Sequence, residues 1–119
     1  MLAHLGVSLL HGAAHTGAHV PLSAAATLFV YVVILAGPLA GLAVSWAAER
    51  IGNWLVAGTM AASLAFGVVN HFMRDSPDQI GHVAPQWRPL FATTALLLAV
   101  IEAGTAVLAL ENIRERSLS

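Results

Sequence analysis

Three histidines follow one another at four-residue intervals near the start of the chain: His11, His15 and His19. An α-helix advances about 100° per residue, so these imidazoles and that of His4 would share one stripe roughly 80° wide. Two histidines at positions i and i+4 of a helix can both reach one metal ion. Because neutral imidazole is a good ligand for zinc, copper and iron, the stripe predicts a transition-metal site.

The partners of this stripe are expected from a later segment that ends in a short run of acidic and histidine residues. His71 and Asp75 are four residues apart, and Asp78 and His82 follow in 75-DSPDQIGH-82. Carboxylates often complete or orient histidine sites. We therefore predict a mixed site of imidazoles and carboxylates. Its candidate ligands are His15, His19, His71, Asp75, Asp78 and His82.

A single acid, Glu102, lies deep within an apolar stretch, 99-AVIEAGTAV-107. Ionisable groups inside membrane segments are costly and often mark a functional site. Its depth along its helix places Glu102 near His11, so these two residues are candidates for proton transfer. The structural alternative is a hydrogen bond from Glu102 to Thr59 or Tyr31.

The composition decides what kind of element must position these side chains. Of the 119 residues, 58% are hydrophobic and 9% are charged, and the mean hydropathy is +0.79. Soluble domains carry about 25% charged residues, so lipid is the expected solvent. A net charge of −1 predicts no nucleic-acid partner. Because the chain has no cysteine, a metal must be bound by histidine, carboxylate or carbonyl groups.

Four apolar segments predict four transmembrane helices in a single domain over residues 1–119. Roughly 20 apolar residues cross a bilayer, and short connections favour an up-down-up-down bundle. Ser23 suits the N-cap of the second helix, Gly37-Pro38 predicts a kink within it, and Pro89 suits the first turn of the fourth. The predicted helices cover residues 2–19, 23–48, 54–75 and 89–111.

Charge in the connections gives a weak orientation signal. Four spans place both termini on one side, together with Arg50, Arg114 and Arg116, and place Arg74 and Arg88 on the other. The side richer in arginine is expected to be cytoplasmic. We therefore predict cytoplasmic termini in a bacterial-type plasma membrane.

A glycine pair, Gly37 and Gly41, forms a G-x-x-x-G pattern in the second predicted helix. Small residues let membrane helices approach closely. The pattern is compatible with packing inside the bundle, and also with a homo-oligomer or a place in a larger membrane complex.

Four functions compete on these features. The favoured one is a membrane metalloprotein with zinc, iron or copper, carrying out redox or hydrolytic chemistry on a small or lipophilic substrate. A haem b electron carrier with His15 and His71 as axial ligands is the second. A proton or metal-ion transporter subunit that uses the histidine stripe and a cofactor-free structural subunit are the others. None of these features decides whether the protein is an enzyme.

The His-x-x-x-His spacing resembles that of membrane non-haem iron hydroxylases and desaturases. Those enzymes carry more histidines, in several boxes, over a longer chain, so the resemblance extends to one spacing and implies no particular activity. The chain has no Walker loop, dinucleotide fingerprint or serine nucleophile elbow.

Overall fold

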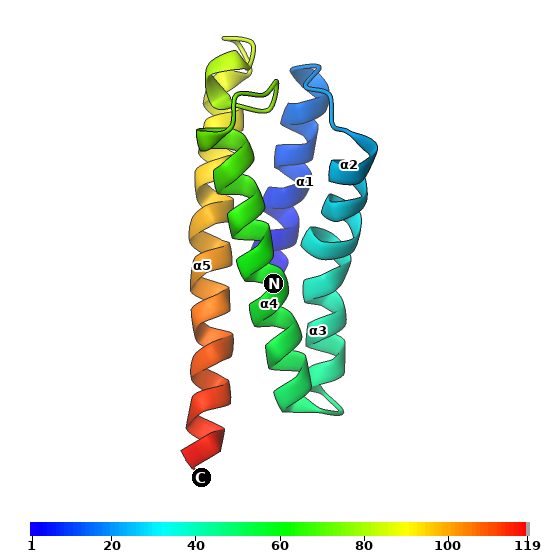
Figure 1. Ribbon diagram of the computed structural model, residues 1–119, viewed down its shortest axis with the longest axis vertical. Coiled ribbons are helices and arrows are strands. Elements are labelled where there is room, and N and C mark those ends of the chain that lie inside the picture. The colour runs from blue at the N-terminus through cyan, green and yellow to red at the C-terminus, as the bar shows by residue number, and fades with distance from the viewer. Residues whose placement is uncertain (119) are drawn as a thin grey trace.

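A computed structural model describes residues 1–118, which form helices and connecting loops and no strands. The helices lie side by side along one common axis (Figure 1). Their bounds in chain order are α1 Leu2–Gly17, α2 Ala24–Phe29, η1 Val30–Ala36, α3 Gly37–Ser45, α4 Glu49–Val68, η2 Val69–Met73, η3 Ile80–His82 and α5 Arg88–Leu118. Segments α2, η1 and α3 are continuous, as are α4 and η2. The prediction of an all-helical chain is confirmed for the described residues.

The helix ends differ from the predicted ones where charged residues continue a helix. Ser23 is an N-cap as predicted, and its hydroxyl accepts a hydrogen bond from the Ala26 amide at 3.1 Å. Helix α4 begins at Glu49, and α5 continues to Leu118. An ion pair of 2.6 Å between Glu49 and Arg116 joins these two extensions. Charged side chains can therefore stabilise helix turns that lie outside the apolar spans.

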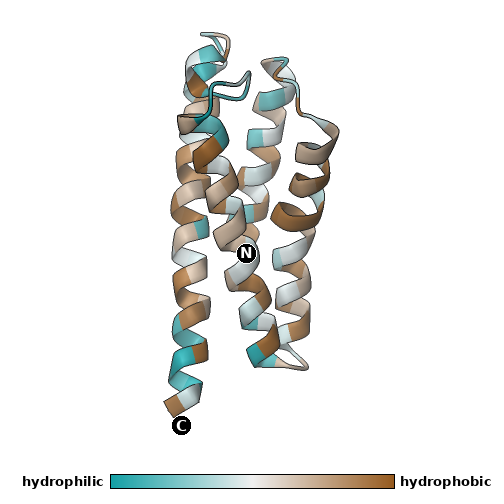
Figure 2. Cartoon of the chain, in the orientation of Figure 1, coloured by the Kyte–Doolittle hydropathy of each residue, from teal (hydrophilic) through white to brown (hydrophobic). Residues whose placement is uncertain are grey.

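Three helical stretches are long and apolar enough to cross a membrane: residues 24–45, 49–73 and 88–118. Hydrophilic residues gather at the two ends of the molecule, and apolar ones predominate between them (Figure 2). Helix α1 has 16 residues. That corresponds to about 24 Å, less than the roughly 30 Å of a hydrocarbon core. The fold therefore supports membrane insertion, while a fourth span stays a prediction.

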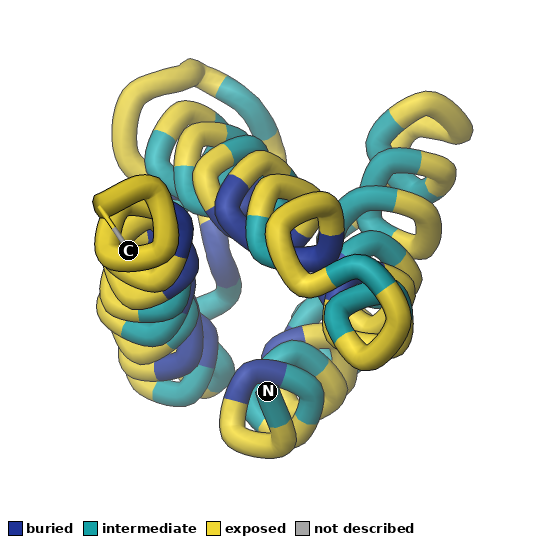
Figure 3. Tube along the Cα trace, turned by 90° about the horizontal axis from the view of Figure 1, so that it is seen from below, coloured by how far each residue is buried: buried dark blue, intermediate teal, exposed yellow. Residues whose placement is uncertain are grey.

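The outer surface differs from that of a soluble protein. Large apolar side chains such as Leu2, Val100 and Met73 are 71–87% exposed. Buried residues face the centre of the molecule and exposed ones face outward (Figure 3). Lipid favours an apolar exterior with the polar side chains turned inward. The buried polar residues are His4, His11, Ser63, His71, Asp78, Thr94 and Glu102.

The kink predicted at Gly37-Pro38 corresponds to a change of helix type. The preceding turns, Val30–Ala36, are π-helical, and α3 starts at Gly37. Proline lacks an amide hydrogen and its ring crowds the carbonyl four residues earlier, so the α-helical pattern cannot run through it. A π-helical segment widens the helix at this point and is frequent at functional sites.

The G-x-x-x-G pattern is used inside the chain, where α3 packs on α4. A Cβ atom added at Gly41 would lie 2.8 Å from Cγ2 of Val56 and 2.9 Å from its backbone nitrogen. At Gly37 it would meet Cγ2 of Thr59 at 2.5 Å. Only glycine permits these approaches. The face of α3 that carries Gly37 and Gly41 therefore packs directly against α4.

Candidate metal site

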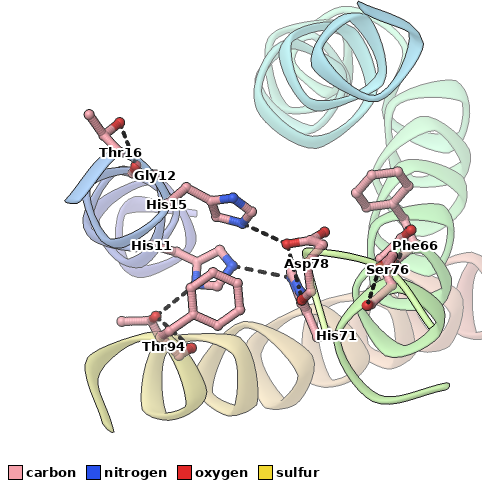
Figure 4. Close-up of polar contacts among 11 residues, drawn as sticks. His11, Gly12, His15, Thr16, Phe66, His71, Ser76, Asp78 and Thr94 are labelled. Carbon is pink, nitrogen blue, oxygen red and sulfur yellow. Dashed lines mark hydrogen bonds and ion pairs between the residues drawn. The ribbon is translucent and has the colours of Figure 1, made fainter. Parts of the chain in front are cut away.

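Three imidazoles from two helices converge at one end of the molecule. His11 and His15 come from α1 and His71 from η2, and each offers one ligand atom within 4.8 Å of the others. The Nε2 atoms of His11 and His71 are only 3.2 Å apart. Figure 4 shows the rings of His11 and His15 pointing from α1 toward Asp78 and His71. This group can hold a metal ion.

Local helix geometry and one aromatic ring fix these positions. The four-residue interval places His11 and His15 one above the other on α1. His71 lies in the π-helical turn η2, where the Arg74 amide bonds to the Val69 carbonyl at 2.7 Å. The fully buried ring of Phe91 on α5 contacts all the imidazoles, with centroid distances of 4.7, 4.8 and 5.1 Å. Phe91 therefore forms an apolar support beneath the cluster.

Hydrogen bonds on the far side of two rings decide where their protons lie. Nδ1 of His71 is 3.1 Å from the backbone carbonyl of Asp78. A carbonyl can only accept, so this nitrogen carries a hydrogen. Nδ1 of His11 is 2.7 Å from the hydroxyl of Thr94. That hydroxyl also lies 2.7 Å from the Leu90 carbonyl. When it donates to this carbonyl it accepts from Nδ1 of His11, and when it donates to Nδ1 the His11 hydrogen lies on Nε2.

The consequence is an unusual pairing of the inner nitrogens. When Thr94 accepts from His11 and both rings are neutral, Nε2 of His11 and Nε2 of His71 each carry a lone pair. These nitrogens face each other at 3.2 Å inside a buried site. A metal ion between the two nitrogens, or a hydrogen on either of them, makes this approach favourable.

Asp78 reaches the cluster from the loop between η2 and α5. Its Oδ1 atom lies 3.2 Å from Nε2 of His15 and 3.3 Å from Nδ1 of His71. Burial raises the pKa of the Asp78 carboxyl, but the close contact with His71 and the other neighbouring imidazoles outweighs burial and holds that pKa below its usual value. Asp78 is therefore a buried anion beside two imidazoles, and it can offset the charge of a cation bound there.

The loop that carries Asp78 is tied to the body of the protein. Val83 is 1% exposed and forms an apolar cluster with Ala14 and Phe91. The Arg88 guanidinium donates hydrogen bonds to the carbonyls of Val83 and Gly81 at 3.0 and 3.2 Å. The loop therefore covers the histidine cluster as a fixed part of the structure.

The other predicted ligands lie outside the buried cluster. Helix α1 ends at Gly17, and His19 adopts a left-handed conformation with φ 53°, so it leaves the histidine stripe. His82 contacts Asp75 at 3.5 Å, and the Asp75 side chain is 94% exposed. These residues line a shallow surface cavity beside Pro21. Of the predicted ligands, the structure brings His15, His71 and Asp78 together.

Glu102 contacts a different histidine from the expected one. Its Oε1 atom lies 3.2 Å from Nε2 of His4, and both residues are buried. The depth estimate that paired Glu102 with His11 assumed that α1 starts at the edge of the bilayer. Met1 instead packs against the apolar cluster that contains Met60, part-way along α4. This register brings His4 to the level of Glu102.

Sequence reasoning missed several residues of the site, although helical spacing points to some of them. Ser8 falls at roughly +60° when His11 is taken as zero, inside the stripe already described. Thr94 precedes Glu102 by eight residues, roughly 80° away, so both lie on one side of α5. The support from Phe91 has no comparable signal, because an aromatic residue in an apolar helix is ordinary.

A cavity of about 530 Å³ adjoins the cluster. His15 and Asp78 line it at the end near the loop, and Glu102 lines it farther along α5. Among the described residues, Oγ of Ser8, Nδ1 of His15 and Oδ1 of Asp78 are buried without a hydrogen-bond partner, and all three residues line this cavity. The histidine cluster and the cavity therefore share a wall.

No known protein family, curated protein or solved structure matches this chain. The chemistry of the site must therefore be judged from its own residues.

Proposed function

We propose that this chain is a small integral membrane metalloprotein in which His11, His15 and His71 bind one transition-metal ion. The observation that carries the proposal is the approach of Nε2 of His11 to Nε2 of His71, 3.2 Å apart, within a group of three imidazoles. A divalent ion between these two nitrogens uses both as ligands. His15 supplies the third ligand, and Asp78 orients the rings and balances charge.

The distances agree with ordinary metal coordination. In a tetrahedral site with metal–nitrogen bonds of about 2.05 Å, two ligand nitrogens are about 3.3 Å apart. The pair formed by His11 and His71 already has this separation, and a ligand nitrogen of His15 lies within 4.8 Å of those of the other two. Three protein ligands leave a fourth position for water or substrate. Zinc at this site supports hydrolytic chemistry, and iron or copper supports redox chemistry.

The site lies within the membrane-embedded part of the proposed protein. We place α1 as a fourth span beside the three longer helices, in an up-down-up-down bundle in a bacterial-type plasma membrane. The excess of arginine favours cytoplasmic termini, so the loop that carries Asp78 faces outward. Association with a second copy or with a larger complex would use a face other than Gly37 and Gly41.

The main competing function uses a proton where we place the metal. A proton shared by His11 and His71 would also satisfy the facing nitrogens, and the pair would then serve a proton-conducting path. Haem gains no comparable support, because a third imidazole, from His15, offers its nitrogen within the same 4.8 Å. Metal content separates these possibilities.

The test is elemental analysis and a visible spectrum of the protein purified in detergent, after exposure to zinc, iron or copper. We expect about one ion per chain for the wild type and almost none for His71→Ala, because two remaining imidazoles bind weakly. His82→Ala removes an exposed histidine from the same region and is the matched control. Wild-type protein without any of these metals, or His71→Ala with full occupancy, contradicts the proposal.

A further inference from the structure

We infer that the cavity beside the histidine cluster binds a membrane-soluble amphiphile with a neutral oxygen head group, either a hydroxyl or a carbonyl. The head would lie at the cluster, and the hydrocarbon body would follow the apolar walls away from it. This inference rests on the proposed function and names the substrate class of the same site.

The size and walls of the cavity fit such a molecule. Its volume, about 530 Å³, lies within the range of small-molecule sites, roughly 300–1,000 Å³. Apolar side chains from η1 and α4 line one part of its wall, among them Val30, Ile34, Leu35, Leu64 and Phe66. A hydrocarbon body contacts these groups well, whereas a polar metabolite would leave its own groups unpaired.

Polar groups at one part of the cavity define the head group. The Ser8 hydroxyl has no protein partner among the described residues and lines the cavity, so a ligand oxygen or hydroxyl can bind it. The acidic residues Asp78 and Glu102 also line the cavity, and no lysine or arginine does. Two carboxylates would balance the charge of one bound divalent ion, so a carboxylate or phosphate head would add an uncompensated negative charge to a buried site, and a neutral oxygen is favoured.

The entrance faces the same apolar zone that we place in lipid. Leu9 on α1 and Tyr31 on η1 both line the cavity, and they are 62% and 64% exposed. Helix α1 packs chiefly against α5, so its side toward η1 borders open space. An opening between two apolar helices admits molecules from the bilayer rather than from water.

A glycine on the cavity wall allows a clean test. Gly12 lines the cavity, and a Cβ added there meets no atom within 4 Å. Gly12→Leu therefore adds volume at the cavity wall from a Cβ that meets no neighbouring helix. Gly104 on α5 also has open space around an added Cβ and does not line the cavity, so Gly104→Leu is the matched control.

The probe is a diazirine-bearing dodecanol, photo-crosslinked to metal-loaded protein in detergent and competed with unlabelled dodecanol or dodecanoate. We expect saturable labelling of η1 and α1, competition by dodecanol, and little competition by dodecanoate. Gly12→Leu displaces about two methylene groups of the ligand, so the apparent affinity should fall about tenfold, while Gly104→Leu leaves it unchanged.

Metal content measured on the same samples separates this inference from the proposed function. Labelling that is unsaturable, or that Gly12→Leu leaves at wild-type affinity, overturns the lipophilic ligand even when one metal per chain is present. Competition by dodecanoate as strong as that by dodecanol overturns the neutral head group. Labelling that depends on Gly12 in protein that takes up no metal supports the ligand and overturns the metal site.

Discussion

The Nε2 atoms of His11 and His71 face each other at 3.2 Å. On the other side of each ring, Nδ1 of His11 contacts the Thr94 hydroxyl at 2.7 Å, and Nδ1 of His71 contacts the Asp78 carbonyl at 3.1 Å. A metal ion bound to both Nε2 atoms requires a hydrogen on each Nδ1, and these two oxygens can accept those hydrogens. Changes to the outer partners should therefore alter metal affinity.

Thr94→Val removes the hydroxyl that accepts from Nδ1 of His11 and keeps the shape of the side chain. Loss of such a partner typically lowers metal affinity about 10–100-fold, because the ring is no longer held in its binding tautomer. Titration of metal-free protein with zinc and a competing chelator measures the change. Thr93→Val, at the exposed neighbouring position, should bind like the wild type. Equal affinities for the two variants would show that Thr94 does not orient His11.

Asp78→Asn removes the buried charge that lies beside His15 and His71. We expect the free energy of unfolding to fall by about 1–3 kcal/mol, since the buried imidazoles lose a charged partner. Asp75→Asn changes an exposed carboxylate and should alter stability by less than about 0.5 kcal/mol. Thermal unfolding in detergent compares the two variants. A larger loss for Asp75→Asn would contradict the structure.

The contribution of Asp78 to stability should disappear in acid. Its pKa in the folded protein lies below the usual 3.8, so the folded state favours the charged form. That contribution is complete above the usual value and is lost as the pH falls through the folded pKa. The groups that act on Asp78 are His71, His15 and His11. In metal-free protein, the stability difference between wild type and Asp78→Asn should shrink below about pH 4. A difference that persists at about pH 2 would contradict the lowered pKa.

The buried contact between His4 and Glu102 predicts a measurable coupling. Replacing either residue by leucine leaves its partner without a counterpart, so each single variant should lose about 1–3 kcal/mol of stability. The double variant leaves nothing unpaired and should lose less than the sum, with a coupling of at least about 0.5 kcal/mol. Glu111→Leu, on the exposed side of α5, is the control. Additive losses would show that His4 and Glu102 do not interact.

Helix periodicity in the sequence was sufficient to predict the inward-facing histidines of α1 and the participation of His71. It was not sufficient for His19, because the helix ends at Gly17 and the next residues turn away. The position of Asp78 depends on how a loop folds over the cluster. A loop has no regular repeat, so residue spacing does not predict where Asp78 lies. To predict which histidine lies beside Glu102, one must know how far α1 is shifted along α5. Packing around Met1 sets this shift, and helix length does not reveal it.

The close contact of α3 with α4 leads to the last prediction, which concerns the frame that holds His71. A Cβ atom at Gly41 would lie 2.9 Å from the backbone nitrogen of Val56 and 3.1 Å from the carbonyl oxygen of Gly52. Backbone atoms cannot rotate away as a side chain does, so Gly41→Ala must push the helices apart.

We expect this single methyl group to lower the stability of the protein by about 1–3 kcal/mol, the usual cost of overpacking. Gly58→Ala adds the same group on α4 at a position with no atom within 4 Å. It should be neutral or stabilising by up to about 1 kcal/mol, because alanine favours helix more than glycine does. Thermal unfolding in detergent provides the comparison. Equal stability of the two variants would mean that α3 and α4 lie farther apart than the glycine contacts indicate.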